Sequence, residues 1–161
     1  MVNTADALPA AAEDYAEVAR QIAGLIAGEA DRIACMASIA CLLHHGFERF
    51  FWTGFYIVDP AKGDELVVGP YQGTPGCMRI PFGQGVCGTA AATGKTQIVA
   101  DVHAIENHIA CDSRSRSEIV VPVFDAESRL IAVLDIDSTA PNAFDETDAQ
   151  WLEQIVRKSF S

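Results

Sequence analysis

The spacing of apolar residues predicts three long helices. Over residues 10–28 apolar side chains recur every three or four positions, which places them on one face of a helix. Asp31 is a suitable N-cap for a second helix, and Gly46 is a suitable end for it. Asp145 precedes a last helix, in which Asp148, three residues later, complements the helix dipole.

Runs rich in aromatic and β-branched residues predict the strands. They cover residues 52–58, 65–68, 96–100, 118–124 and 129–137. A short helix is predicted over residues 85–93, before Gly94. Residues 69–85, rich in glycine and proline, and residues 101–117 follow neither pattern. Because long irregular segments in a compact domain are typically functional, we expect the site beside these two.

This order of elements predicts the α+β fold class, with one mainly antiparallel sheet and helices packed on it. The length of 161 residues suits a single domain over residues 1–161, with residues 1–10 as a flexible N-terminus. Hydrophobic residues make up 50% of the chain and charged residues 20%, which is enough apolar material for a packed core.

The charge balance limits the partners. Lys and Arg number 11 against 22 Asp and Glu, giving a net charge of −11. This balance disfavours nucleic acid and anionic membranes, and it permits a cationic or zwitterionic small ligand. The N-terminus lacks the pattern of an export signal. The apolar run over residues 33–43 is shorter than the roughly 20 residues that span a bilayer, so we expect a cytoplasmic protein.

The chain has five cysteines, an odd number, and we expect no structural disulfide framework in a cytoplasmic protein. Cys35 and Cys41 lie among apolar residues of the second predicted helix, where a thiol packs as a small hydrophobic group. Cys77, Cys87 and Cys111 lie in or beside the two irregular segments. These three are the candidates for reactive chemistry.

Two of the three have an alternative interpretation. Cys111 is either a nucleophile, its thiolate favoured by His108 and opposed by Asp112, or a loop thiol without a role. Cys87 falls in the first turn of the short helix, where free backbone N–H groups lower a thiol pKa, or it is chosen for packing. Cys77 follows a turn sequence whose mobility lets a resolving cysteine reach another thiol.

Asp135 and Asp137 interrupt an otherwise apolar strand. Side chains alternate along a strand, so both carboxylates share one face, and Glu118 begins the neighbouring strand. Clustered carboxylates raise one another's pKa, which makes one of them a proton donor near neutral pH, and they also bind cations. The alternative is that both aspartates are ordinary strand-end residues open to solvent.

Aromatic and histidine side chains complete the candidate chemistry. Trp52, Phe55 and Tyr56 lie on both faces of the first predicted strand, and most of them are expected in the core. One of them is a candidate for the wall of an apolar pocket that holds a thioether or sulfoxide group. His103, His108 and Cys111 have metal-ligand chemistry. Their spacing matches no metal motif, so no metal site is predicted.

Seven motifs together resemble the free methionine-(R)-sulfoxide reductases, a family of single-domain GAF proteins. They are residues 69–73 (GPYQG), 77–80 (CMRI), 83–89 (GQGVCGT), 101–103 (DVH), 108–113 (HIACDS), 117–122 (SEIVVP) and 134–138 (LDIDS). The resemblance implies a GAF fold, a six-stranded antiparallel sheet with helices on both sides. This sequence departs from the family pattern at Phe51, where Asn is common, and at residues 105–107, where IEN replaces Phe-Pro-Gly.

The resemblance also implies an activity, the reduction of free L-methionine (R)-sulfoxide. By this likeness Cys111 is the catalytic nucleophile, Cys77 the main resolving cysteine, and Cys87 a second thiol in the relay. The residues implied to bind substrate are Glu118, Asp135, Asp137 and Trp52. The family needs no bound cofactor, is recycled by NADPH-linked thioredoxin, and commonly forms homodimers.

Two other functions remain open from the sequence. One is a non-catalytic GAF sensor module that binds a small molecule, although no output domain follows within the chain. The other is a thiol peroxidase that reacts with hydrogen peroxide and ignores the sulfoxide. Loss of thiols on addition of methionine sulfoxide distinguishes the reductase from both.

Overall fold

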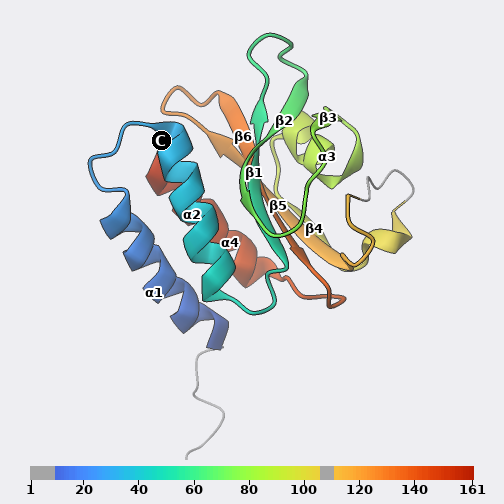
Figure 1. Ribbon diagram of the computed structural model, residues 1–161, viewed down its shortest axis with the longest axis horizontal. Coiled ribbons are helices and arrows are strands. Elements are labelled where there is room, and N and C mark those ends of the chain that lie inside the picture. The colour runs from blue at the N-terminus through green and yellow to red at the C-terminus, as the bar shows by residue number, and fades with distance from the viewer. Residues whose placement is uncertain (1–9, 106–110) are drawn as a thin grey trace, which may run out of the picture.

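A six-stranded antiparallel sheet forms the centre of the computed structural model, which describes residues 10–105 and 111–161 (Figure 1). The strand order is β3-β2-β1-β6-β5-β4. The strands are β1 (Trp52–Val58), β2 (Glu65–Gln72), β3 (Arg79–Pro81), β4 (Gln97–Val99), β5 (Ser117–Phe124) and β6 (Leu130–Ser138). The predicted α+β class and antiparallel sheet are confirmed.

Helices cover both faces of the sheet, as the family resemblance implied (Figure 1). One face packs against three helices, and the other packs against a single short helix and the segments around it. The three helices are α1 (Ala10–Leu25), α2 (Arg32–Gly46) and α4 (Glu146–Phe160). The short helix is α3 (Gly85–Thr93), and a 3-10 turn, η1 (Val102–Ala104), follows β4.

Side-chain alternation along the central strands divides the core in two. Phe55, Ile119 and Leu134 belong to the larger cluster, which packs against α1, α2 and α4. Tyr56 and Val120, the next residues along β1 and β5, belong to the smaller cluster, which packs against α3. A polar side chain on the same face of the sheet as Tyr56 and Val120 therefore lies beneath α3.

The predicted helix starts are confirmed by their caps. The Asp31 carboxylate accepts a hydrogen bond from the backbone N–H of Ala34 at 2.9 Å. Asp145 and Asp148 form a reciprocal capping box at the start of α4. Helix α1 ends at Leu25, three residues earlier than predicted, because a turn with Gly28 at a φ of 77° closes it.

The prediction of one loop over residues 69–85 is wrong. Strand β2 continues to Gln72, and β3 lies within the predicted loop and pairs with the start of β2. The pairing of β1 with β2 shifts between Gly54 and Tyr56, a β-bulge that takes up the Gly69-Pro70 pair. The other strands match their predicted ends to within one residue.

A buried hydrogen-bond cluster holds α1 and α4 together. The Tyr15 hydroxyl donates to Asp148 Oδ1 at 2.7 Å, and the Arg49 guanidinium forms an ion pair with the same carboxylate. Tyr15 is fully buried and stacks on Trp151, with ring centroids 6.0 Å apart. One carboxylate therefore joins the first helix, the last helix and the segment before β1.

Some predictions fall on residues that the structure does not describe. Residues 1–9, most of the predicted flexible N-terminus, lie outside the described residues. Residues 106–110 do too, and they include His108 and two of the three residues that depart from the family motif. In the described part of the chain, no helix combines the length and the apolar character needed to cross a membrane.

Candidate active site

Two central strands bring three carboxyl groups together beneath α3. Antiparallel pairing of β5 with β6 puts Glu118 opposite Asp137 and Val120 opposite Asp135, and β1 puts Gly54 on the other side of Asp135. Glu118 is 5% exposed and Asp135 6% exposed, whereas Asp137 is partly exposed. The two aspartates share a face, as predicted, and the alternative of solvent-exposed strand ends is wrong.

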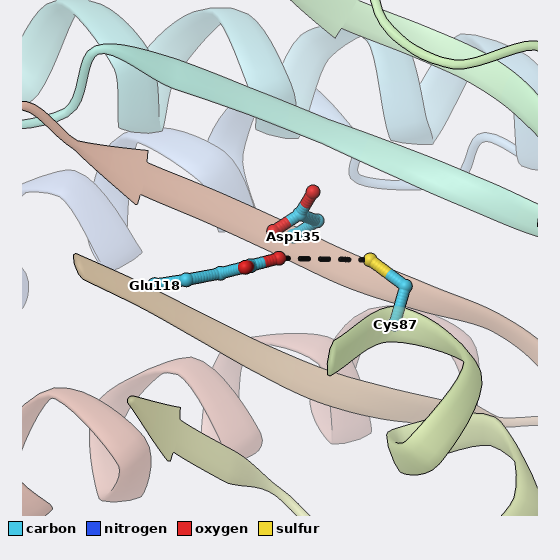
Figure 2. A group of neighbouring side chains, drawn as sticks. All are labelled: Cys87, Glu118 and Asp135. Carbon is cyan, nitrogen blue, oxygen red and sulfur yellow. Dashed lines mark hydrogen bonds between the residues drawn. The ribbon is translucent and has the colours of Figure 1, made fainter. Parts of the chain in front are cut away.

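The first turn of α3 adds a thiol to these carboxyl groups. Cys87 is buried, and its Sγ lies 3.9 Å from Glu118 Oε1, a distance at which a thiol donates a hydrogen bond. Figure 2 shows the Cys87 side chain reaching from α3 toward Glu118 and Asp135 on the sheet. A Cβ on Gly88 would lie 2.5 Å from the Pro81 carbonyl, so only glycine lets this turn pack so closely.

Burial changes the protonation of the whole acidic cluster. It raises the pKa of Glu118 from an ordinary 4.5 to about 8, with a contribution from the charge of Asp137. Burial, and then Glu118, raise the pKa of Asp135 well above its ordinary range, and burial and Asp135 do the same for the pKa of Asp137. The cluster therefore holds protons at neutral pH and offers a carboxylic acid to a bound molecule.

One oxygen of this cluster lacks a hydrogen-bond partner. Asp135 Oδ1 is buried, and no group in the described part of the chain bonds it. A buried carboxyl oxygen without a partner costs free energy, so it is suited to a ligand that brings a donor. An ammonium group is such a donor.

The predicted lowering of the Cys87 pKa is wrong. Burial raises the pKa of this thiol well above its ordinary 9.0, and the charges of Asp135 and Glu118 raise it further. Removal of water disfavours a thiolate more than the helix N-terminus favours it. Cys87 is therefore a neutral thiol at neutral pH, and its role as a second relay thiol stays a prediction.

Aromatic rings form one wall above the acidic cluster. Trp52 and Tyr56 stack with centroids 5.7 Å apart, and Tyr71 stacks on the outer side of Trp52 at 5.1 Å. A Cβ on Gly76 would lie 2.9 Å from the Tyr56 hydroxyl oxygen and 3.0 Å from the Trp52 ring. The segment that carries Cys77 can therefore lie directly on these rings only because it has glycine at position 76.

A disulfide between Cys77 and Cys111 joins the two irregular segments, with a Cα–Cα distance of 5.4 Å. Cys111 is exposed and Cys77 is half-buried, so the pair is open to an external reductant. Cys35 and Cys87 are free and buried, and Cys41 is free and half-buried. For Cys35 burial in α2 agrees with the predicted packing role.

The acidic cluster, Cys87, Cys111 and two of the aromatic rings line one cavity of about 40 Å³. The predicted site residues that line it are Trp52, Tyr56, Cys87, Cys111, Glu118, Asp135 and Asp137. Cys77 is attached to this set through its disulfide. A water needs about 10–15 Å³ of such space, so the cavity of the disulfide form is small.

Hydrogen bonds that the sequence did not predict hold the cavity mouth together. Thr74 donates from its hydroxyl to Asp112 Oδ2 at 2.9 Å, and its carbonyl accepts from the Trp52 indole N–H at 2.7 Å. Arg114 donates two guanidinium hydrogen bonds and one backbone hydrogen bond to Asp112, which keep the Asp112 pKa far below its ordinary value. Asp112, next to Cys111, is thus held by hydrogen bonds from Thr74 and Arg114. The sequence indicated Thr74 only as part of the turn over residues 74–76.

Three donor atoms in the cluster are near enough to share a cation. Cys87 Sγ and one carboxyl oxygen each of Glu118 and Asp135 lie within 4.8 Å of one another, and in the described residues this is the one such group. His103, a ligand candidate by residue type, is exposed and outside it. Because Cys87 and Glu118 hydrogen-bond each other directly, we assign no metal to the group.

Comparison with known proteins places the chain in a family. Residues 37–158 match the GAF domain family. Free methionine-R-sulfoxide reductase of Escherichia coli is 44% identical over 89% of this chain and 85% of its own. The chain belongs to the free methionine-R-sulfoxide reductase family of GAF proteins.

Solved structures of this reductase family have the same fold. The enzyme from Neisseria meningitidis, in complex with its substrate, superposes with a TM-score of 0.87 and 48% identity over 98% of this chain and 92% of that one. The reduced form of the Staphylococcus aureus enzyme gives a TM-score of 0.85 and 44% identity over 91% and 92% of the two chains.

Proposed function

We propose that this protein reduces free methionine (R)-sulfoxide to methionine, the reaction named by its reductase relatives. The observation that carries the proposal is the meeting of a disulfide-bonded cysteine pair, with Cys111 exposed, and a buried acidic cluster at one cavity. A sulfur nucleophile and a proton donor are the two groups that this reaction requires.

The proposed first step uses the reduced form. The Cys111 thiolate attacks the sulfoxide sulfur, and one carboxylic acid of Glu118, Asp135 or Asp137 gives its proton to the sulfoxide oxygen. In the resulting adduct the bond between the two sulfurs and the substrate sulfur–oxygen bond both break, the protonated oxygen bonds to the Cys111 sulfur, and methionine leaves with the electron pair. Cys111 is then a sulfenic acid. The raised pKa of Glu118, about 8, supports this group as a proton donor at neutral pH.

The proposed second step closes the disulfide. The Cys77 thiol attacks the sulfenic sulfur of Cys111, and water leaves. The Cys77–Cys111 disulfide in the structure is the bond that this step would form, which supports the proposed pairing. Thioredoxin then reduces the disulfide by thiol exchange and is itself oxidised, with NADPH as the final electron source. No bound cofactor is required.

The acidic cluster supports selection of the free amino acid. Only free methionine sulfoxide carries an α-ammonium group, and Asp135 Oδ1 is the buried oxygen that lacks a donor. A peptide-bound methionine sulfoxide leaves that oxygen without a hydrogen-bond donor. An unpaired buried group of this kind lowers kcat/KM for the analogue, relative to the free amino acid, by about 10⁴-fold or more. The wall of Trp52 and Tyr56 suits the sulfur-bearing side chain. A cytoplasmic location and a homodimer belong to the same proposal.

The decisive experiment is NADPH consumption coupled through thioredoxin. The R and S epimers of methionine sulfoxide are compared, each free and within a peptide. Turnover of the free R epimer alone is the expected result. Binding without loss of thiols would instead favour a sensor module, and oxidation by hydrogen peroxide without turnover of the sulfoxide would favour a thiol peroxidase.

A further inference from the structure

Cys87 is the one thiol at the cavity that is outside the disulfide. We propose that Cys87 is a positioning residue, a hydrogen-bond donor that holds Glu118 toward the cavity, and not an electron carrier. This inference rests on the proposed reductase function and concerns the same site.

The contact with Glu118 is the first reason. Cys87 Sγ donates to Glu118 Oε1 at 3.9 Å, and both side chains are buried (Figure 2). A carboxyl group at the end of a flexible side chain needs a fixed partner to keep one orientation in a cavity. Asp135 on β6 also hydrogen-bonds Glu118, and Cys87 adds a contact from the α3 side.

The position of the thiol is fixed by packing. Cys87 belongs to the small core cluster with Val86, Ala90 and Val120. The adjacent Gly88 packs against the Pro81 carbonyl so closely that a Cβ would overlap it. A relay thiol has to travel to a partner sulfur, and this packing opposes such travel.

The protonation state of the Cys87 thiol is the third reason. Burial and the neighbouring carboxylates raise the Cys87 pKa well above 9.0, so little thiolate forms at neutral pH. Disulfide exchange requires a thiolate as the attacking group. The Cys77–Cys111 disulfide, already complete without Cys87, satisfies the electron balance of one turnover.

The test compares two substitutions at one position. Cys87→Ala removes the donor and the thiol, whereas Cys87→Ser removes the thiol and keeps a donor. We expect Cys87→Ala to lower thioredoxin-linked kcat/KM about 3- to 10-fold, the effect of one hydrogen bond. Cys87→Ser is expected to restore most of that loss. Equal loss of activity in both variants would overturn the proposal, because only a relay depends on the sulfur itself.

A second measurement does not depend on any variant. After a single turnover of the wild-type protein without reductant, mapping of disulfides is expected to find Cys77 joined to Cys111 and Cys87 as a free thiol. A disulfide that contains Cys87 contradicts the positioning role. If the wild-type protein does not reduce the sulfoxide at all, the proposed function fails instead, so the two failures are distinguishable.

Discussion

Glu118 on β5 lies directly opposite Asp137 on β6, and both side chains face the cavity. Two like charges opposite each other in a sheet destabilise it, and burial adds to the cost. The pKa of each group is raised, so the pair avoids the repulsion by holding protons. Ionisation of both carboxyl groups would lower the free energy of unfolding. Such a cost is typical of residues that serve a function.

The pH dependence of stability tests this arrangement. The folded pKa of Glu118, about 8, lies above its ordinary 4.5, so the folded state binds this proton more tightly than the unfolded state. Its contribution is therefore complete below about pH 4.5 and is lost as the pH rises toward about 8. We expect urea unfolding to show a smaller decrease in stability over this range for Glu118→Gln than for wild type. Parallel pH curves would contradict a raised Glu118 pKa.

The sequence predicted the members of the site better than their contacts. Strand periodicity put Asp135 and Asp137 on one face, since alternation depends on local geometry alone. The opposition of Glu118 to Asp137 depends on strand register, which the geometry of the turn between β5 and β6 sets and side-chain alternation alone does not give. The motif resemblance supplied Cys77 and Cys111 as partners, whereas residue spacing left their roles open.

The errors have two physical causes. Gly69 and Pro70 suggested a loop, because both residues weaken a regular strand, but a β-bulge accommodates them within β2. The Cys87 pKa was predicted from its position in a helix, and tertiary burial reversed it. The local sequence shows where a residue lies on a helix or strand. The exposure of its side chain to water, and therefore its pKa, depends on which other segments pack over that side chain.

Asp135→Asn tests the proposed ammonium contact. The substitution removes the acid group that can ionise when an ammonium group binds at Asp135 Oδ1, and a hydrogen bond to a charged group contributes about 1.5–3 kcal/mol. We expect KM for free methionine sulfoxide to rise about 10- to 100-fold. Asp64→Asn, an equivalent change at an exposed turn, is the control and is expected to leave KM unchanged. An unchanged KM in Asp135→Asn would refute the ammonium contact.

Cys111→Ser and Cys77→Ser are expected to separate the two steps of the cycle. Without the Cys111 nucleophile there is no turnover with either dithiothreitol or thioredoxin. Without Cys77 the sulfenic acid still forms, so dithiothreitol supports turnover while thioredoxin-linked turnover slows. Rates with both reductants give the answer, and Cys41→Ser, in α2, serves as the control. Full thioredoxin-linked activity in Cys77→Ser would assign the resolving role to another thiol.

Tyr15→Phe tests the cluster that joins α1 to α4. The variant loses the 2.7 Å hydrogen bond to Asp148 while the ring and its stacking on Trp151 remain. A buried hydrogen bond to a carboxylate is worth about 1–3 kcal/mol, so the free energy of unfolding in urea is expected to fall by that amount. Tyr71→Phe, on an exposed ring, is expected to change it by less than about 0.5 kcal/mol. Equal effects would remove the special role of the Tyr15 hydroxyl.

Gly76→Ala tests whether the cavity wall requires close backbone contact. The new methyl group would lie 2.9 Å from the Tyr56 hydroxyl oxygen and 3.0 Å from the Trp52 ring, so the rings or the segment before Cys77 must shift. Such overpacking typically costs about 1–3 kcal/mol, and here it falls on the substrate wall. We expect kcat/KM to fall about 5- to 100-fold, with the fold retained by circular dichroism. Gly24→Ala, with nothing within 4 Å of the new Cβ, is the matched control, and equal activity in both variants would show that the wall tolerates displacement.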